Sequence, residues 1–134
     1  MEPVKVVIRY ANGKLIKGYT NDFFPNKPMF HVRPTESQAT DKGVEVYIKE
    51  LKGVFFVRDF TGNRSYNENK QITEGQQTTG KRVKVTFKDK EALVGTTLGY
   101  DPGRPGFFIT PIDPQSNNLR IFVVSAAVNN IVLL

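Results

Sequence analysis

The sequence predicts an all-β protein made of two copies of one small five-stranded unit. Three observations support this fold class. The chain repeats itself at a fixed offset of 77 residues, which is the separation of Gly18 and Gly95. Each copy contains short segments in which apolar and polar residues alternate, as they do in strands with one buried face. No long segment keeps the periodicity of an amphipathic helix.

The repeat is carried by residue types that constrain the backbone. Without gaps, residues 4–57 superpose on residues 81–134 with nine identical positions. Gly-x-Thr is followed in both copies by Pro-x-x-Pro-x-Phe-x-x-x-Pro at one fixed spacing. We therefore predict a first unit over residues 1–60 and a second over residues 81–134. The segment between them, 61–80, is polar and rich in turn-forming residues, which is typical of a mobile linker.

Each unit divides into five expected strands in the same order. The strands of the first unit are expected at 5–10, 15–23, 29–33, 44–48 and 54–60, and those of the second at 82–88, 92–100, 106–110, 119–124 and 131–134.

The first strand of each unit alternates apolar and polar residues. In the first copy it leads into Asn12-Gly13, a strong signal for a tight hairpin turn. The second copy has no glycine at this turn, which leaves its turn free to differ. The second strand contains a glycine in its middle, Gly18 or Gly95, and a glycine there marks a sharp bend.

Proline-bounded loops at 24–28 and 101–105 lead from the second strand into the third. A short segment before the fifth strand, at 49–51 or 125–128, has the length of a single helical turn. Five strands with a bent second strand and one helical turn before the fifth follow the order of an SH3-like or Sm-like barrel. The expected fold is therefore two tandem five-stranded barrels of this kind, related by internal duplication.

Two resemblances agree with this expectation. Residues 83–89 with 95–102 are similar to the first Sm motif, and residues 123–131 are similar to a degenerate second Sm motif. The whole chain also resembles an uncharacterised bacterial domain family through Gly-Tyr-Thr-x-Asp-Phe-Phe-Pro-x-x-Pro, at 18–28, and Gly-Tyr-Asp-Pro-x-Arg-Pro-Gly-Phe-Phe, at 99–108. Members of that family are sometimes fused to PilZ domains. The resemblance implies tandem Sm-like or SH3-like barrels rather than an activity.

Composition excludes several classes of site. The chain has no cysteine and a single histidine, His31, so disulfides, thiolate metal sites and cysteine nucleophiles are excluded. The first residues lack the basic start and apolar run of a signal peptide, and no apolar stretch is long enough to span a bilayer. We expect a cytoplasmic protein without a metal or another cofactor.

Catalysis is not predicted. The carboxylates Asp22, Glu36, Asp101 and Asp113 lie near the expected loop ends, but no catalytic motif aligns them. Aspartates next to glycine and proline in loops usually accept hydrogen bonds from backbone N–H groups two residues on. His31 is expected to be a half-buried strand residue rather than a general base.

The candidate binding residues are those that the duplicated loops present. They are Phe24, Lys27, Asp101, Arg104 and Phe108. Phe24 and Phe108 have no aromatic residue at their repeat equivalents, Asp101 and His31, so they either lie outside the cores or, as we favour, pack between the units.

We predict a non-catalytic bacterial interaction or regulatory module that binds a protein partner or self-associates. The alternative is weak RNA or DNA binding through a basic face, because the net charge is +6. That alternative is less favoured, since Lys27-Pro28 and Arg104-Pro105 stand where Sm proteins carry a Met-Asn pair that contacts RNA bases, and a proline side chain cannot hydrogen-bond a base.

Overall fold

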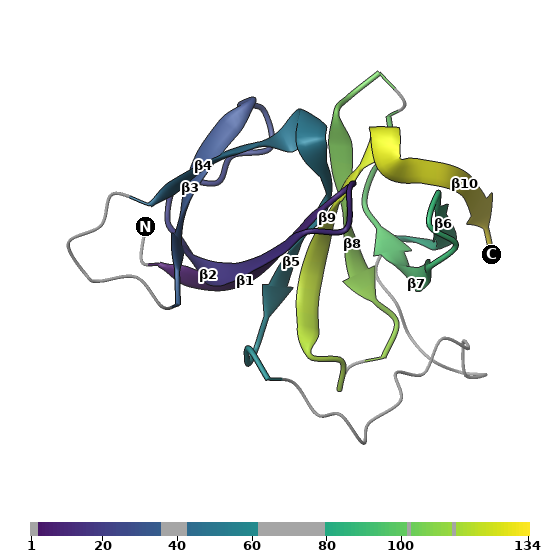
Figure 1. The fold of residues 1–134 in the computed structure, drawn as a ribbon. Helices are drawn as coiled ribbons and strands as arrows, with labels where there is room; N and C mark the ends of the chain where they lie inside the picture. Colours follow the sequence, from purple (N-terminus) through teal and green to yellow (C-terminus); the bar gives the residue numbers. More distant parts are fainter. Residues whose placement is uncertain (1–2, 36–42, 62–79, 102, 114) are drawn as a thin grey trace.

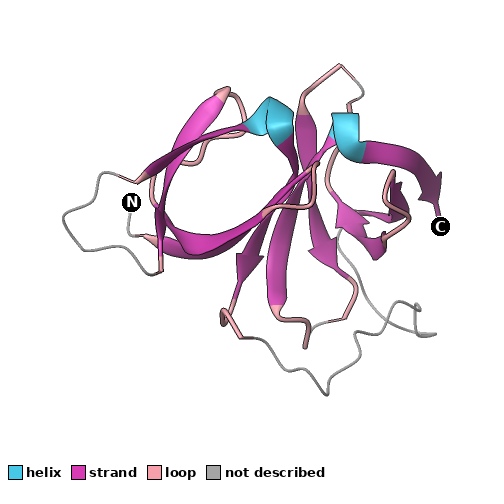
Figure 2. Ribbon diagram, in the orientation of Figure 1, coloured by secondary structure: helices cyan, strands magenta, loops and turns pink. Residues whose placement is uncertain are grey.

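The computed structural model describes residues 3–35, 43–61, 80–101, 103–113 and 115–134, and in these ranges the protein is all-β (Figures 1 and 2). The first set of strands is β1 (Val4–Tyr10), β2 (Leu15–Thr20), β3 (Met29–Pro34), β4 (Val44–Tyr47) and β5 (Leu51–Val57). The second set is β6 (Lys81–Phe87), β7 (Ala92–Thr97), β8 (Gly106–Pro111), β9 (Asn118–Val124) and β10 (Val128–Leu133). Single 3-10 turns, η1 (Ile48–Glu50) and η2 (Ser125–Ala127), precede β5 and β10.

The two sets pair their strands in the same register. Val6 lies opposite Gly18 in the β1–β2 pair, and Val83 lies opposite Gly95 in the β6–β7 pair. Val54 lies opposite Ile8 in the β5–β1 pair, and its repeat equivalent, Ile131, lies opposite Val85 in the β10–β6 pair. The repeated registers agree with the predicted duplication.

The expectation of two closed barrels needs correction. The ten strands form one antiparallel sheet with the open order β10-β6-β7-β8-β9-β5-β1-β2-β3-β4. The fifth strand of the first set does not close onto its own fourth strand, because its free edge pairs with β9 of the second set, with Val54 opposite Phe122. The sheet therefore continues from the first set of strands into the second through the β5–β9 pair, which we call the junction, and its two end strands are β4 and β10.

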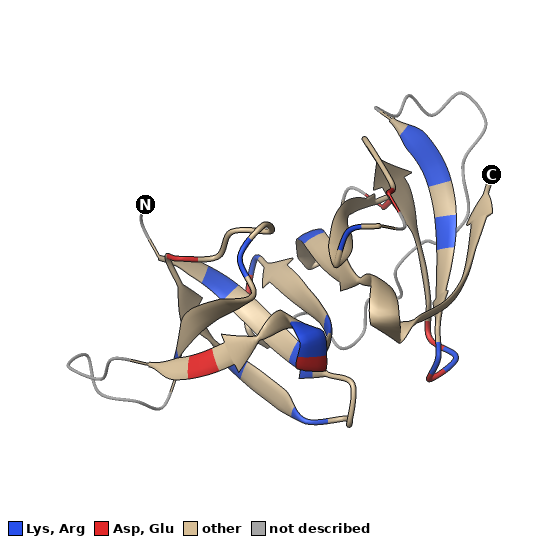
Figure 3. Cartoon of the chain, turned by 90° about the horizontal axis from the view of Figure 1, so that it is seen from above, with Lys and Arg blue, Asp and Glu red and all other residues tan. Residues whose placement is uncertain are grey.

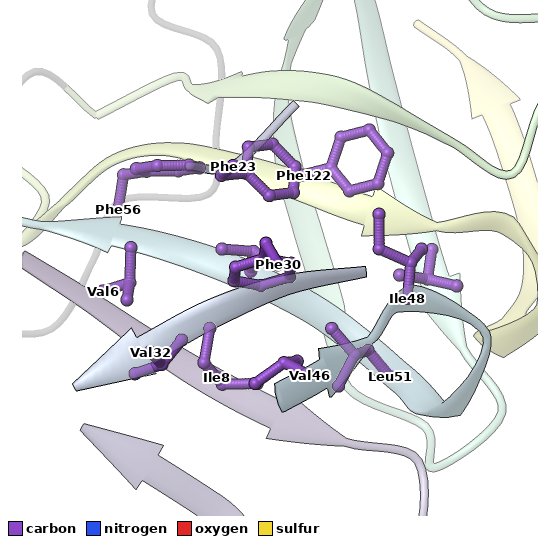
Figure 4. Close-up of a cluster of buried hydrophobic side chains, with 12 residues drawn as sticks. Val6, Ile8, Phe23, Phe30, Val32, Val46, Ile48, Leu51, Phe56 and Phe122 are labelled. Atoms are coloured by element: carbon purple, nitrogen blue, oxygen red, sulfur yellow. The ribbon is translucent and has the colours of Figure 1, made fainter. Parts of the chain in front are cut away.

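Two hydrophobic clusters fill the molecule, and both contain residues from both sets. Cluster 1 lies inside the first set and also receives Phe122 and Val124 of β9, as Figure 4 shows for Phe122 beside Phe23 and Phe56. Cluster 2 lies inside the second set and receives side chains from β1 and β5 of the first. Its members from the first set are Val7, Phe55 and Val57.

β5 shows why the junction is well packed. Successive side chains of a strand point to opposite faces, so Val54 and Phe56 reach cluster 1 while Phe55 and Val57 reach cluster 2. All seven residues of β5 are buried. Burial on both faces and pairing on both edges make β5 the central strand of the protein.

Local boundaries differ from the expected ones at the second and fifth strands of both sets. The second strands end at Thr20 and Thr97, three residues early, and the fifth strands begin at Leu51 and Val128, directly after the 3-10 turns. The β6–β7 turn does not differ from the β1–β2 turn: Lys90 takes the positive φ that Gly13 has in the first copy. Its neighbours repeat the same backbone hydrogen bonds.

The predicted division into residues 1–60, 61–80 and 81–134 stays a prediction, and most of the expected linker lies outside the described residues. Within those residues, no helix has the length and apolar character needed to cross a membrane.

Candidate functional site

The two proline-bounded loops are built alike and lie at the same end of their sets. The Lys27 N–H donates to the Phe24 carbonyl in the first loop, and the Arg104 N–H donates to the Asp101 carbonyl in the second, each at 3.1 Å. Each loop is also joined to the 3-10 turn of its own set. In both sets the turn's first N–H donates to a loop proline: Ile48 to Pro28 at 3.0 Å and Ser125 to Pro105 at 2.9 Å.

An aspartate holds the start of the first loop. Asp22 Oδ2 lies 2.7 Å from His31 Nδ1, and Asp22 Oδ1 accepts the His31 backbone N–H at 2.9 Å. The Thr20 hydroxyl lies 3.2 Å from the same Oδ1 and donates to the His31 carbonyl at 2.8 Å. Partial burial raises the pKa of Asp22, but the hydrogen bonds from His31 and Thr20 outweigh burial and lower the pKa below its ordinary 3.8. The carboxylate therefore anchors the loop in its charged form.

The other predicted loop carboxylates serve as turn acceptors. Asp101 Oδ1 accepts the Gly103 N–H at 2.8 Å, and Asp113 Oδ1 accepts the Gln115 N–H at 2.9 Å. Both bonds join residues two positions apart, as predicted from the turn chemistry of aspartate. Glu36 lies outside the described residues.

A groove of about 700 Å³ runs between the two loops and the two 3-10 turns, and we call it the junction groove. Its lining residues are Asn26, Lys27, Pro28, Tyr47, Ile48, Lys49, Arg104, Pro105, Val124, Ser125 and Ala126. Both sets contribute equivalent backbone to it, because 26–28 and 104–105 are loop segments while 47–49 and 124–126 are 3-10 turn segments. Three of the lining side chains are cations and none is acidic, so the groove combines an apolar floor with a positive rim.

A broader hollow of about 1000 Å³, which we call the loop hollow, lies next to it, mainly on the second set. Asp101, Arg104 and Phe108 line it, together with Pro25 of the first loop. Arg104 Nε lies 3.7 Å from Asp101 Oδ2 across an exposed ion pair. Since Arg104 also lines the junction groove, the two depressions share one cationic side chain.

Arg120 on β9 forms part of the wall of the loop hollow. Its guanidinium lies 4.5 Å from the Phe56 ring centroid and 4.6 Å from the Phe108 ring centroid. Phe56 belongs to the first set and Phe108 to the second, so this cation–π contact spans the junction. The same two rings lie 6.3 Å apart and join a larger aromatic group with Phe23 and Phe122.

The structure brings four of the five predicted binding residues to these two depressions. Asp101, Arg104 and Phe108 line the loop hollow, and Lys27 and Arg104 line the junction groove. Phe108, on β8 of the second set, packs against cluster 1, most of whose members come from the first set. Phe24 is 42% exposed, and the Lys27 ammonium lies 5.0 Å from its ring centroid. Phe24 therefore lies outside both cores.

Sequence reasoning did not place Lys49, Tyr47 and Arg120 among the residues that line these depressions. Lys49 and Tyr47 reach the junction groove because β5 pairs with β9, and that pairing places the 3-10 turn of the first set opposite the loop of the second. The fixed offset of 77 residues relates the two sets to each other, but it carries no signal for which strand edges join.

Positive charge is spread over both sets of strands, with acidic residues among the basic ones (Figure 3). The basic residues therefore do not form a single stripe along one strand. Within the described ranges, no three His, Asp or Glu side chains gather closely enough to hold a metal ion.

The model of a family of unknown function, DUF6982, matches residues 2–134. No curated protein and no solved structure matches the chain. The match covers nearly the whole chain and agrees with the expected uncharacterised family. The expected fusion to PilZ domains and the Sm-like assignment stay predictions.

Proposed function

The chain belongs to the DUF6982 family, and on that premise we propose that it is a non-catalytic interaction module that binds a segment of a partner protein in the junction groove. One observation carries the proposal: the groove joins an apolar floor to a rim of Lys27, Lys49 and Arg104 without an acidic lining residue. A segment that fits this surface has an apolar side chain flanked by carboxylates. The apolar side chain provides affinity by burial, and the carboxylates provide charge complementarity.

The construction of the groove supports this role. Its backbone is held by the paired hydrogen bonds from Ile48 to Pro28 and from Ser125 to Pro105. Asp22 fixes the start of the first loop. A groove whose walls are fixed in advance binds with less loss of conformational entropy than one that must be ordered.

A fluorescence titration tests the proposal. The full-length protein is titrated against a labelled peptide in which leucine and phenylalanine alternate with glutamate, and against the same peptide with serine at the apolar positions. We expect the first peptide to bind at least about tenfold more tightly, because only it buries apolar surface. Lys27→Glu combined with Arg104→Glu should weaken binding at least about tenfold.

Lys14→Glu is the matched control, because Lys14 is also an exposed cation but lies at the β1–β2 turn. This variant should bind the peptide like the wild type. Equal binding of the leucine and serine peptides, or equal loss of binding in the control and the double variant, contradicts the proposed groove.

Nucleic-acid binding is the second candidate, and the three cations of the groove together with the half-exposed Tyr47 favour it. Oligonucleotides of uridine and thymidine should then bind with an affinity that falls steeply between about 50 mM and about 200 mM salt. Binding of the glutamate–leucine peptide should fall less, because its apolar contacts do not depend on counterion release. If an oligonucleotide binds more tightly than the peptide at the higher salt concentration, the partner is RNA or DNA and not a protein.

A further inference from the structure

The outer edge of β10 has no partner strand among the described residues, although its repeat equivalent is paired on both edges. β5 lies between β1 and β9, whereas β10 pairs only with β6. The C-terminal half of the strand exposes apolar side chains: Leu133 is 68% exposed, and Val132 is exposed as well. Exposed apolar edge strands readily pair with another chain.

A hollow of about 480 Å³ lies beside this edge, and we call it the β10 hollow. Its lining residues are Lys81, Val83, Thr97, Tyr100, Ser125, Val128, Asn129, Asn130, Ile131 and Leu133. Six of these ten positions correspond, at the offset of 77 residues, to members of cluster 1. The corresponding members are Val6, Phe23, Ile48, Leu51, Val54 and Phe56.

The first set shows what fills such a hollow. There β9 pairs with β5, Phe122 lies opposite Val54, and Phe122 and Val124 enter cluster 1 (Figure 4). Phe108 of the neighbouring strand packs against the same cluster. No strand among the described residues makes the equivalent pairing in the second set.

We propose that the edge of β10 binds an antiparallel strand of a partner protein, whose aromatic side chain lies opposite Ile131 and enters the β10 hollow. The β5–β9 pair supplies both the direction and the register, because Ile131 is the equivalent of Val54. Main-chain hydrogen bonds to the edge provide affinity, and the hollow selects the side chain. This site lies at the opposite end of the sheet from β4, and Ser125 is the one lining residue that it shares with the junction groove.

Two further observations suit a partner strand with polar and acidic flanks. Lys81 lies on the rim of the hollow. The buried Ser125 hydroxyl, which also lines the hollow, has no hydrogen-bond partner among the described residues. A polar group from a bound strand would satisfy this hydroxyl, and a carboxylate would pair with Lys81.

A second copy of this chain fits the hollow poorly. Its free fourth strand, β4, carries Glu45 and Tyr47 at the repeat positions of Phe122 and Val124. His31 stands at the repeat position of Phe108. Docking β4 onto β10 as β9 docks onto β5 would place the Glu45 carboxylate opposite the apolar Ile131, and desolvating that charge opposes binding. We therefore assign the site to a different protein.

The chain's own β9 sequence is the probe. A labelled peptide of residues 117–125, with glutamates added at both ends, is titrated into the full-length protein. We expect saturable binding and increased protection of the amides of residues 129–133 from hydrogen exchange. A peptide carrying Phe122→Ala should bind at least about tenfold more weakly, since it loses the aromatic side chain that enters the hollow.

Variants of the protein locate the site. Leu133→Asp places a charge at the exposed edge and should weaken binding at least about tenfold, whereas Leu15→Asp, on β2 of the first set, should leave it unchanged. The variant with Lys27→Glu and Arg104→Glu should still bind the β9 peptide, which separates this site from the junction groove.

Three results overturn the proposal. They are equal binding of the wild-type and Phe122→Ala peptides, new amide protection at β4 instead of β10, and unchanged binding to the Leu133→Asp protein. Sedimentation of the protein without peptide tests whether a second copy of the chain occupies the edge. A dimer in which the amides of both β4 and β10 are protected from exchange assigns the edge to self-association.

Discussion

The side chain of Lys52 connects the two sets of strands. It lies on β5 and is only 8% exposed, and its ammonium reaches the β6–β7 turn of the second set. The ammonium lies 2.7 Å from Asp89 Oδ2, pairs with Glu91 Oε1 and lies 4.7 Å from the Phe87 ring centroid. The hydrogen bond from Lys52, followed by the bond from the Glu91 backbone N–H, lowers the pKa of Asp89.

The lowered pKa makes this contact depend on pH. A carboxyl whose pKa is lower in the folded state stabilises the fold above its ordinary pKa of 3.8. That contribution is lost as the pH falls through the folded-state pKa. Lys52→Met should change the free energy of unfolding at pH 7 by about 1 kcal/mol or less, because the carboxylates stay half-exposed and methionine keeps the packing on Phe87.

Urea unfolding between about pH 7 and about pH 3 measures the effect. We expect the wild type to lose more stability than Lys52→Met over this range, because the variant lacks the ammonium that lowers the pKa of Asp89. Lys14→Met, an exposed control, should follow the wild type. Identical pH profiles for the wild type and Lys52→Met would show that the ion pair does not contribute to stability.

The glycines within the second strands hold a place that the sequence analysis singled out. A β-carbon at Gly18 would lie 2.4 Å from the Arg33 carbonyl oxygen, and one at Gly95 would lie 2.2 Å from the Thr110 carbonyl oxygen. Both contacts are with the backbone of the adjacent third strand, so neither can be relieved by moving a flexible side chain. The glycines permit β2 and β7 to approach β3 and β8 this closely.

Gly95→Ala should therefore destabilise the protein by about 2 kcal/mol or more, as overpacking against a fixed backbone does. Gly99→Ala is the matched control, because a β-carbon there meets no atom within 4 Å. We expect the control to change the free energy of unfolding by less than about 0.5 kcal/mol. Chemical denaturation of the two variants measures both changes in the free energy of unfolding. Similar losses of stability in both variants would mean that Gly95 is not required for the close approach of β7 to β8.

The sequence predicted which elements form more accurately than it predicted where they begin and end. β5 begins at Leu51, directly after η1, because Leu51 pairs with Tyr10 across a register shift in β1. β2 ends at Thr20, whose side chain hydrogen-bonds to Asp22 and to the His31 carbonyl. Both ends depend on contacts with other segments, which alternation of apolar and polar residues does not encode.

At the scale of the whole molecule, the β5–β9 pair makes the two sets depend on each other. Phe122 belongs to the second set but is buried in cluster 1 with only 1% exposure. Phe55 belongs to the first set but is buried in cluster 2. Neither core is complete without side chains from the other set, so we expect the protein to unfold in one cooperative transition.

Phe122→Ala tests this dependence. The substitution should lower the free energy of unfolding by about 3–5 kcal/mol, as the loss of a buried phenylalanine does. Hydrogen exchange should accelerate in β1 and β2 of the first set as well as in β8 and β9 of the second. Two separate transitions, or faster exchange confined to the second set, would mean that the sets unfold independently.

The residues alone were enough to predict the all-β class, the ten strands, the glycines within the second strands and the paired loops that carry Lys27 and Arg104. These features follow from local physics, because alternation, glycine and proline restrict the backbone wherever they occur. Contacts between distant segments, by contrast, set the pairing of β5 with β9, the contact of Arg120 with Phe56 and Phe108 and, among the described residues, the unpaired edge of β10. Every strand edge offers the same N–H and C=O groups, so the choice of neighbour depends on side chains that meet only after the chain has folded.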